Sequence, residues 1–247
     1  MSNECINNNK TQKGFNIRKL ITALVILICI PATILVFWKF GDRKYYLTSV
    51  VIIIFSMIPF FLSFEKRRPQ AREIVVLSVM CAIAVASRAA FIMVPHFKPM
   101  AGIIIITGMA FGAEAGFLTG AMSALVSNFI FLQGPWTPWQ MFAYGIAGFL
   151  AGYLYSKGIL TRKKISLGIF GVLIIMLVVG PILDTCAIFT MSDTIDTSVI
   201  SAVYLSGLPV NMVHAFATML TLILVSGPMF EKLDRIKLKY GMVEYEI

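Results

Sequence analysis

Long runs of apolar residues constrain this chain more than any other feature. A helix needs roughly 20 apolar residues to cross a bilayer core. Six runs reach or approach that length: Leu20 to Trp38, Tyr46 to Phe64, Ile74 to Val94, Trp139 to Tyr155, Leu167 to Phe189 and Leu205 to Phe230. With 58% hydrophobic and only 13% charged residues, the 247-residue chain is too apolar for a soluble domain. We therefore predict an all-α, polytopic membrane helical bundle.

The charged residues and the cysteines exclude other classes of protein. The net charge is +9, but the basic residues lie between the apolar runs, where they normally set membrane orientation. We therefore expect no nucleic-acid partner. The four cysteines, Cys5, Cys29, Cys81 and Cys186, contain no C-x-x-C pair, and three of them lie inside apolar runs. They predict neither a disulfide framework nor a zinc site. The first run is too long for a signal peptide and is interpreted as a retained anchor.

A seventh apolar stretch, Ala101 to Leu132, is too long for one span. As a single helix its 32 residues would extend about 48 Å, against a hydrocarbon core of about 30 Å. A break near Gly112 to Glu114 gives two helices, and eight spans in all. The cytoplasmic segments then hold four Lys or Arg residues each and the outer segments four in total, whereas without the break most would lie outside. This distribution predicts the break and two cytoplasmic termini.

One short outer loop concentrates aromatic and amide side chains. It reads FLQGPWTPWQMF, from Phe131 to Phe142, and joins the fifth and sixth spans. Its two prolines favour a stiff turn. The tryptophans alone could form an aromatic belt at the membrane interface, but a belt does not need the neighbouring amides. The loop therefore predicts ligand contacts from Gln133, Trp136, Trp139 and Gln140.

Five polar side chains fall inside predicted helices at a similar outer depth, beneath this loop. They are Arg88, Asn128, Asp184, Asn211 and His214. Intramembrane ionisable groups are costly and often functional. Arg88 is predicted six residues, about 9 Å, below the outer end of its helix, and His96 and Lys98 stand in the next outer loop. The shared depth predicts an outward-facing substrate pocket with the tryptophan loop as its lid.

These polar groups also have other interpretations. Arg88 and Asp184 could form a buried ion pair, His214 could be a hydrogen-bonded interior histidine, and the asparagines could bridge helices. A stand-alone secondary transporter or channel using Arg88 and Asp184 is the alternative function. No P-loop, H-E-x-x-H or G-x-S-x-G motif is present, and two histidines leave little scope for a metal centre. An enzyme is therefore not expected.

Small residues recur at intervals of four on several predicted helices. The rows are Ala82, Ala86 and Ala90; Gly108, Gly112, Gly116 and Gly120; and Ala143, Ala147 and Ala151. Small residues at this spacing let helices approach closely in lipid. We interpret the glycine row and the later alanine row as internal packing. The first alanine row could equally serve a partner protein.

Three stretches together resemble a known family. They are CAIAVASRAAFIMVPHFKP, GAEAGFLTGAMSALVSNFIF and QGPWTPWQMFAYGIAGFLAG. They resemble the membrane-embedded, substrate-binding S components of energy-coupling factor (ECF) vitamin transporters, over about residues 71 to 234. The resemblance implies a six-helix core that binds substrate near its outer face, under the loops Pro95 to Met100, Gln133 to Pro138 and Met191 to Tyr204.

The resemblance also implies partners and a division of the chain. Ala82, Ala86 and Ala90 would contact a transmembrane T component, and two ATP-binding subunits would drive import, so that this chain needs no cofactor of its own. Residues 65–234 would form the core, 20–64 two additional helices, and 1–19 and 235–247 cytoplasmic tails of a plasma-membrane protein. The tryptophan loop is similar to cobalamin-type members, which favours cobalamin or a related corrinoid as the vitamin.

Overall fold

The computed structural model describes residues 45–66, 69–191 and 195–241, besides Ala32. Within those residues all regular structure is helical. The helices are α3 (Tyr45–Lys66), α4 (Ala71–Ala90), α5 (Met100–Phe111), α6 (Ala113–Phe131), α7 (Thr137–Ser156), α8 (Lys164–Ile174), the π-helical segment η2 (Ile175–Val179), α9 (Gly180–Met191) and α10 (Thr197–Lys239). The predicted span Leu20 to Trp38 lies, apart from Ala32, outside the described residues.

The described helices include five stretches long and apolar enough to cross a membrane. They are Leu47–Lys66, Ala71–Ala90, Ala113–Phe131, Lys164–Thr190 and Thr197–Lys239. The 12-residue α5 is a shorter apolar helix, and α7, at the predicted span Trp139 to Tyr155, falls outside this set. The predicted all-α, polytopic membrane bundle is therefore confirmed.

Gly112 separates α5 from α6, as the distribution of basic residues predicts. Its φ of 97° lies in the region that favours glycine, and its N–H donates to the carbonyl of Gly108, which ends α5. The carbonyl of Gly112 then accepts from the N–H of Gly116 as α6 begins. The short helix α5 and the 19-residue α6 thus replace one overlong span, and they return the chain to the same end of the bundle.

Glycines allow α5, α6 and α7 to pack backbone against backbone. A Cβ atom built on Gly108 or Gly116 would meet the carbonyl oxygen of Gly148 at 2.2 or 2.4 Å, and one on Gly120 would meet that of Tyr144 at 2.2 Å. The alanines of the later row are fully buried. The interpretation of both rows as internal packing is confirmed.

We expect Gly116→Ala to destabilise the bundle strongly. The new Cβ atom would lie 2.4 Å from the Gly148 oxygen and 2.7 Å from Cα of Gly108, so one helix must move. Overpacking of this kind costs roughly 3 kcal/mol. Thermal unfolding of the purified protein in detergent measures the loss. Gly227→Ala is the matched control, because its Cβ would meet nothing within 4 Å and alanine favours helix by up to about 1 kcal/mol. Equal effects of the two variants would contradict the packing argument.

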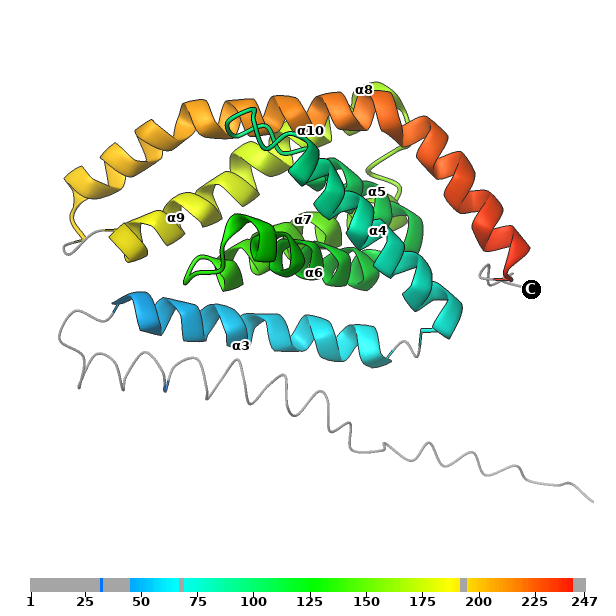
Figure 1. Ribbon diagram of the computed structural model, residues 1–247, viewed down its shortest axis with the longest axis horizontal. Helices are drawn as coiled ribbons and strands as arrows, with labels where there is room; N and C mark the ends of the chain where they lie inside the picture. The colour runs from blue at the N-terminus through cyan, green and yellow to red at the C-terminus, as the bar shows by residue number, and fades with distance from the viewer. Residues whose placement is uncertain (1–31, 33–44, 67–68, 192–194, 242–247) are drawn as a thin grey trace, which may run out of the picture.

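The last helix, α10, is much longer than the span predicted from hydropathy. Its 43 residues extend about 65 Å, and it contains Pro209 and Pro228. It runs along the whole bundle in Figure 1 and packs on α5, α8, α9 and η2. The predicted lid loop Met191 to Tyr204 is therefore wrong in its second half, because the Asp196 carboxylate accepts from the N–H of Val199 and caps a helix that begins at Thr197. The helix also continues into the predicted tail at 235–247.

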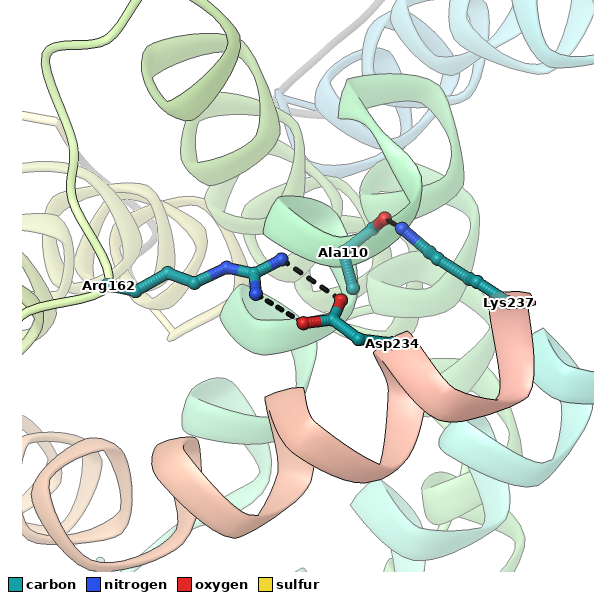
Figure 2. A network of polar contacts seen from close by, with 4 residues as sticks. All are labelled: Ala110, Arg162, Asp234 and Lys237. Carbon is teal, nitrogen blue, oxygen red and sulfur yellow. Dashed lines mark hydrogen bonds and ion pairs between the residues drawn. The ribbon is translucent and has the colours of Figure 1, made fainter. Parts of the chain in front are cut away.

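Polar contacts hold the C-terminal part of α10 against the bundle (Figure 2). Arg162, in the loop before α8, donates two hydrogen bonds to Asp234, at 2.6 and 3.2 Å. One turn further on, Lys237 donates to the carbonyl oxygen of Ala110 near the end of α5. The hydrogen bond to Asp234 also raises the pKa of Arg162. These contacts lie at the end of the bundle opposite the α6–α7 turn.

The additional helix α3 covers one side of the core. It packs on α6, α7 and α9 and is the lowest labelled helix in Figure 1, on the side away from α10. Phe60 stacks on Phe117 of α6, with ring centroids 4.2 Å apart. In the described part of the chain, α3 therefore leaves the alanine face of α4 uncovered.

Candidate functional site

The turn between α6 and α7 is built from local hydrogen bonds. Leu132 adopts a φ of 74°, which is uncommon for a residue with a side chain, and the N–H of Thr137 donates to the carbonyl of Gly134. Pro138 occupies the first turn of α7, where a missing N–H costs nothing. The predicted stiff turn is present but shorter than expected, because α7 already begins at Thr137.

Asn128, at the end of α6, is the centre of a hydrogen-bonded group. Its amide nitrogen donates to Thr137 Oγ1 at 3.1 Å and to Gln140 Oε1 at 2.9 Å, and its oxygen accepts from Arg88 at 3.1 Å. Thr137 in turn donates to Gln133 Oε1 at 2.8 Å. We call Arg88, Ser127, Asn128, Gln133, Thr137 and Gln140 the Asn128 cluster. It joins α4, α6 and α7, so that the tryptophan turn is fixed to the bundle by buried polar contacts.

Arg88 lies in the last turn of α4 and not, as predicted, six residues below the helix end, because α4 ends at Ala90. Its side chain is 8% exposed and donates from one nitrogen, Nη1, to Ser127 Oγ at 2.5 Å as well as to Asn128. The guanidinium carbon also stands 4.2 Å from the centroid of the Phe131 ring. Both acceptors, Ser127 Oγ and Asn128 Oδ1, are neutral, so neither hydrogen bond pairs the buried guanidinium with a carboxylate.

Asp184 and Asn211 form a separate pair between α9 and α10. The amide of Asn211 donates to Asp184 Oδ2 at 2.8 Å. Both side chains pack on glycines of the facing helix, since a Cβ on Gly180 would meet Asn211 at 2.7 Å and one on Gly207 would meet Asp184 at 2.6 Å. The alternative in which Arg88 pairs with Asp184 is therefore wrong, because each has other partners.

We expect the substitutions Arg88→Gln and Asp184→Asn to act independently on stability. The two residues share no partner. The changes in unfolding free energy caused by substitutions at two such sites usually add within about 0.5 kcal/mol. Unfolding of the single and double variants measures the coupling. The same cycle on Arg162→Gln and Asp234→Asn is the control, because that pair is in direct contact and should show a coupling of up to about 1 kcal/mol. Substantial recovery of stability in the Arg88/Asp184 double variant would restore the ion-pair interpretation.

His214 lies inside the bundle on α10, one turn beyond Asn211. It is 3% exposed, its ring meets Tyr144 edge-on at 5.9 Å, and its Nε2 has no hydrogen-bond partner within the described residues. Arg88, His96 and Lys98 are all near enough to act on it electrostatically. His96 itself is exposed, with a φ of 62°. The interpretation of His214 as a satisfied interior histidine therefore leaves one ring nitrogen unexplained.

The two tryptophans occupy different environments. Trp136, on the turn, is 40% exposed, whereas Trp139, on the first turn of α7, is 7% exposed and stacks on Phe189 of α9 at 5.9 Å. The Nε1 of Trp139 is a second buried nitrogen without a partner in the described part. A buried, stacked ring is not what an interfacial belt requires.

Some of the predicted residues meet and others do not. Contacts connect Arg88, Asn128, Gln133 and Gln140, while Asp184 and Asn211 form their own pair. Sequence reasoning missed three buried contributors, namely Ser127, Thr137 and Tyr144. Ser127 and Thr137 directly neighbour residues that it chose, but a hydroxyl in an apolar helix more often bonds to its own backbone, so the sequence held no clear signal for them.

The alanine row of α4 faces outward. Ala82, Ala86 and Ala90 are exposed, whereas Ala84 and Val85 on the opposite side are buried. Ala82 also lines an apolar groove of about 280 Å³ between α4 and α6. These small side chains therefore form an uncovered strip along the helix.

Comparison with known proteins identifies the fold and the class. The family model for the S component of ECF-type riboflavin transporters matches residues 69–230, which include α4 to α9 and most of α10. No curated protein and no solved structure gives a match. The matched region contains the Asn128 cluster, the tryptophan turn and the alanine strip. The chain therefore belongs to the ECF S-component family described by that model, and is a substrate-binding membrane subunit of an ECF importer and not an enzyme.

Proposed function

We propose that this subunit captures a flavin, with riboflavin as its vitamin, at the end of the bundle that carries the Asn128 cluster. This end would face the outside of the cell, with both termini in the cytoplasm, as the distribution of basic residues indicates. A separate transmembrane T component and two ATP-binding subunits would complete the importer in the plasma membrane and would bind the ATP.

The observation that carries the proposal is the polar Asn128 cluster, together with two buried ring nitrogens that lack partners in the described part of the chain. Amides and a hydroxyl meet at the α6–α7 turn. The ring nitrogens of Trp139, on α7, and His214, on α10, are buried without partners in the described part of the chain. Buried polar atoms without partners are rare in proteins, and a ligand with several carbonyl and ring-nitrogen atoms would satisfy them. An isoalloxazine ring offers such atoms along one edge and an apolar face for the aromatic side chains.

The tryptophan loop favoured a corrinoid on sequence grounds, whereas the matching family model is named for riboflavin. We prefer the flavin for a physical reason as well. The polar groups form one compact cluster at the α4, α6 and α7 ends, which suits a ligand with a single polar edge. A corrin carries amides around its whole rim and needs acceptors on several sides.

Titration of the purified protein with riboflavin and, separately, with cobalamin tests the proposal. We expect stoichiometric riboflavin binding with quenching of flavin fluorescence, and no cobalamin binding. The reverse result would assign the corrinoid. Uptake in cells should require the ATP-binding subunits, whereas uptake by this chain alone would favour the stand-alone transporter that uses Arg88 and Asp184.

We expect Trp139→Ala to weaken ligand binding by about 5- to 150-fold. One buried aromatic contact contributes roughly 1 to 3 kcal/mol, and the residue lies on the first turn of α7, next in the chain to Gln140. Trp139→Phe, which keeps a stacked ring on Phe189, should lose much less. Phe129→Ala is the control, because that ring is 74% exposed on α6. Unchanged affinity in a folded Trp139→Ala variant would return the residue to a structural role.

A further inference from the structure

A groove of about 960 Å³ lies beside the turn between α7 and α8, at the end of the bundle opposite the α6–α7 turn. Lys163 and Lys164 line the groove, together with Ser166. Every other side chain that lines it is apolar, and these side chains come from α7, the turn and α8. They include Leu154, Ile159, Ile165, Ile169, Phe170 and Leu173. We call this feature the α7–α8 groove.

The turn beside the groove is rigid and presents apolar side chains outward. Gly158 has a φ of 73°, and the N–H groups of Ile159 and Leu160 both donate to the carbonyl of Leu154, at 3.0 and 3.1 Å, so the turn closes on the end of α7. Ile159 is nevertheless 70% exposed, and Ile165, in the first turn of α8, is 77% exposed. Exposed apolar surface of this kind marks a contact with lipid or with a partner.

The depth of the groove matches one leaflet of a bilayer. Along α8 it extends from Lys164 to Leu173, which is about 14 Å. Half of a hydrocarbon core of about 30 Å is about 15 Å. The charged side chains line only the end at Lys163 and Lys164. A transmembrane partner helix needs a surface across both leaflets, whereas this groove fits one lipid chain with its headgroup at the lysines.

The positive charge at the end of the groove is not balanced by an acidic residue. The neighbouring Arg162 is paired with Asp234, whereas Lys163 and Lys164 are exposed and form no ion pair within the described residues. No acidic side chain of the described chain lines the groove. In addition, α8 starts at Lys164 with no side-chain cap and no acid in its first turn, so the helix dipole adds to the positive potential.

We infer that the α7–α8 groove binds an anionic glycerophospholipid, with one acyl chain along α8 and the phosphate at Lys163 and Lys164. The acyl chain gains little by leaving the bilayer, because lipid tails are as apolar as the groove. Selectivity must therefore come from the headgroup. Each basic side chain near the membrane surface favours an anionic lipid by about fivefold, so two lysines predict a preference of about 30-fold. The inference is independent of the ligand bound at the α6–α7 end.

Native mass spectrometry of the purified protein, titrated with phosphatidylglycerol or with phosphatidylcholine of the same chains, tests the inference. We expect the wild-type protein to bind phosphatidylglycerol at least about tenfold more tightly. The double variant Lys163→Gln/Lys164→Gln should reduce this preference to about threefold or less. Lys66→Gln/Lys239→Gln is the matched control, because these two exposed lysines lie at the same end of the bundle but do not line the groove. It should keep the preference of the wild-type protein.

A second pair of variants tests the groove itself. Leu173→Trp fills its deep end and should weaken phosphatidylglycerol binding by at least about threefold, whereas Leu177→Trp, one turn further on and outside the groove, should not. Equal binding of the two lipids by the wild-type protein would overturn the inference, as would equal loss of the preference in the two lysine double variants. Competition by glycerol 3-phosphate would replace the lipid by a soluble phosphate. Loss of assembly with the partner subunits in Leu173→Trp, with lipid binding unchanged, would assign the groove to a protein instead.

Discussion

Ala82→Trp and Ala86→Trp are expected to abolish assembly with a T component while leaving ligand binding by the isolated subunit intact. Both alanines are exposed on α4 in a strip that α3 leaves uncovered. A partner helix can approach such a strip closely, and a tryptophan would hold the two backbones apart and remove many small contacts at once. An exposed apolar side chain in lipid costs the folded subunit little. Co-purification with the partner subunits and ATP-dependent uptake measure the effect, and both should fall to background.

Ile169→Trp provides the matched control for that experiment. This residue is 57% exposed on α8, away from α4, and the substitution adds the same ring to another apolar face. It should leave assembly and uptake unchanged. Normal assembly of both alanine variants would show that the strip is not the docking face. Loss of ligand binding in the isolated variants would instead mean that the strip packs inside the protein.

Asn128→Leu is expected to reduce ligand affinity by roughly 30- to 1000-fold. The substitution keeps the number and branching of the side-chain heavy atoms but removes one acceptor from Arg88 and the donors to Thr137 and Gln140. Each buried group left without a partner costs about 1 to 3 kcal/mol, and the tryptophan turn loses its attachment to α6. Titration measures the affinity, and the unfolding temperature shows how much of the loss is structural.

Thr119→Val controls for the removal of a buried polar group as such. The Thr119 hydroxyl lies on the same helix, is 1% exposed and has no hydrogen-bond partner within the described residues. Its replacement by a group of equal shape should change neither affinity nor stability by much. If Asn128→Leu bound ligand normally, the Asn128 cluster would be a structural feature of the helix ends and not part of the site.

Hydropathy and charge predicted most of the helices and the break between α5 and α6. The break at Gly112 followed from the distribution of basic residues, and the glycine row showed which helices approach closely. The start of α10 did not follow, because its first turns, from Thr197 to Tyr204, are too polar to register as a span. Asp196 followed by Ser198 was the available signal, since a capping aspartate marks a helix start whatever the hydropathy.

The partners of the site residues could not be predicted from the sequence. Depth along a helix follows from residue counting, and it correctly suggested that Arg88 and Asn128 are near each other. Which side chains touch depends on how each helix is rotated and on where it ends. Arg88 turned toward α6 and Asp184 toward α10, so two opposite charges at the same predicted depth bonded to amides and a hydroxyl instead of to each other.

The contact of α6 with α7 also limits how this protein can move. Helices that slide past one another normally do so by exchanging side-chain rotamers at their interface. Between Gly116, Gly120, Tyr144 and Gly148 the facing atoms are largely main chain, so there are few rotamers to exchange and little room for either helix to shift. A motion that carries substrate across the membrane therefore cannot come from α6 sliding along α7. We expect the α5–α6–α7 unit to move as one solid piece in any such motion.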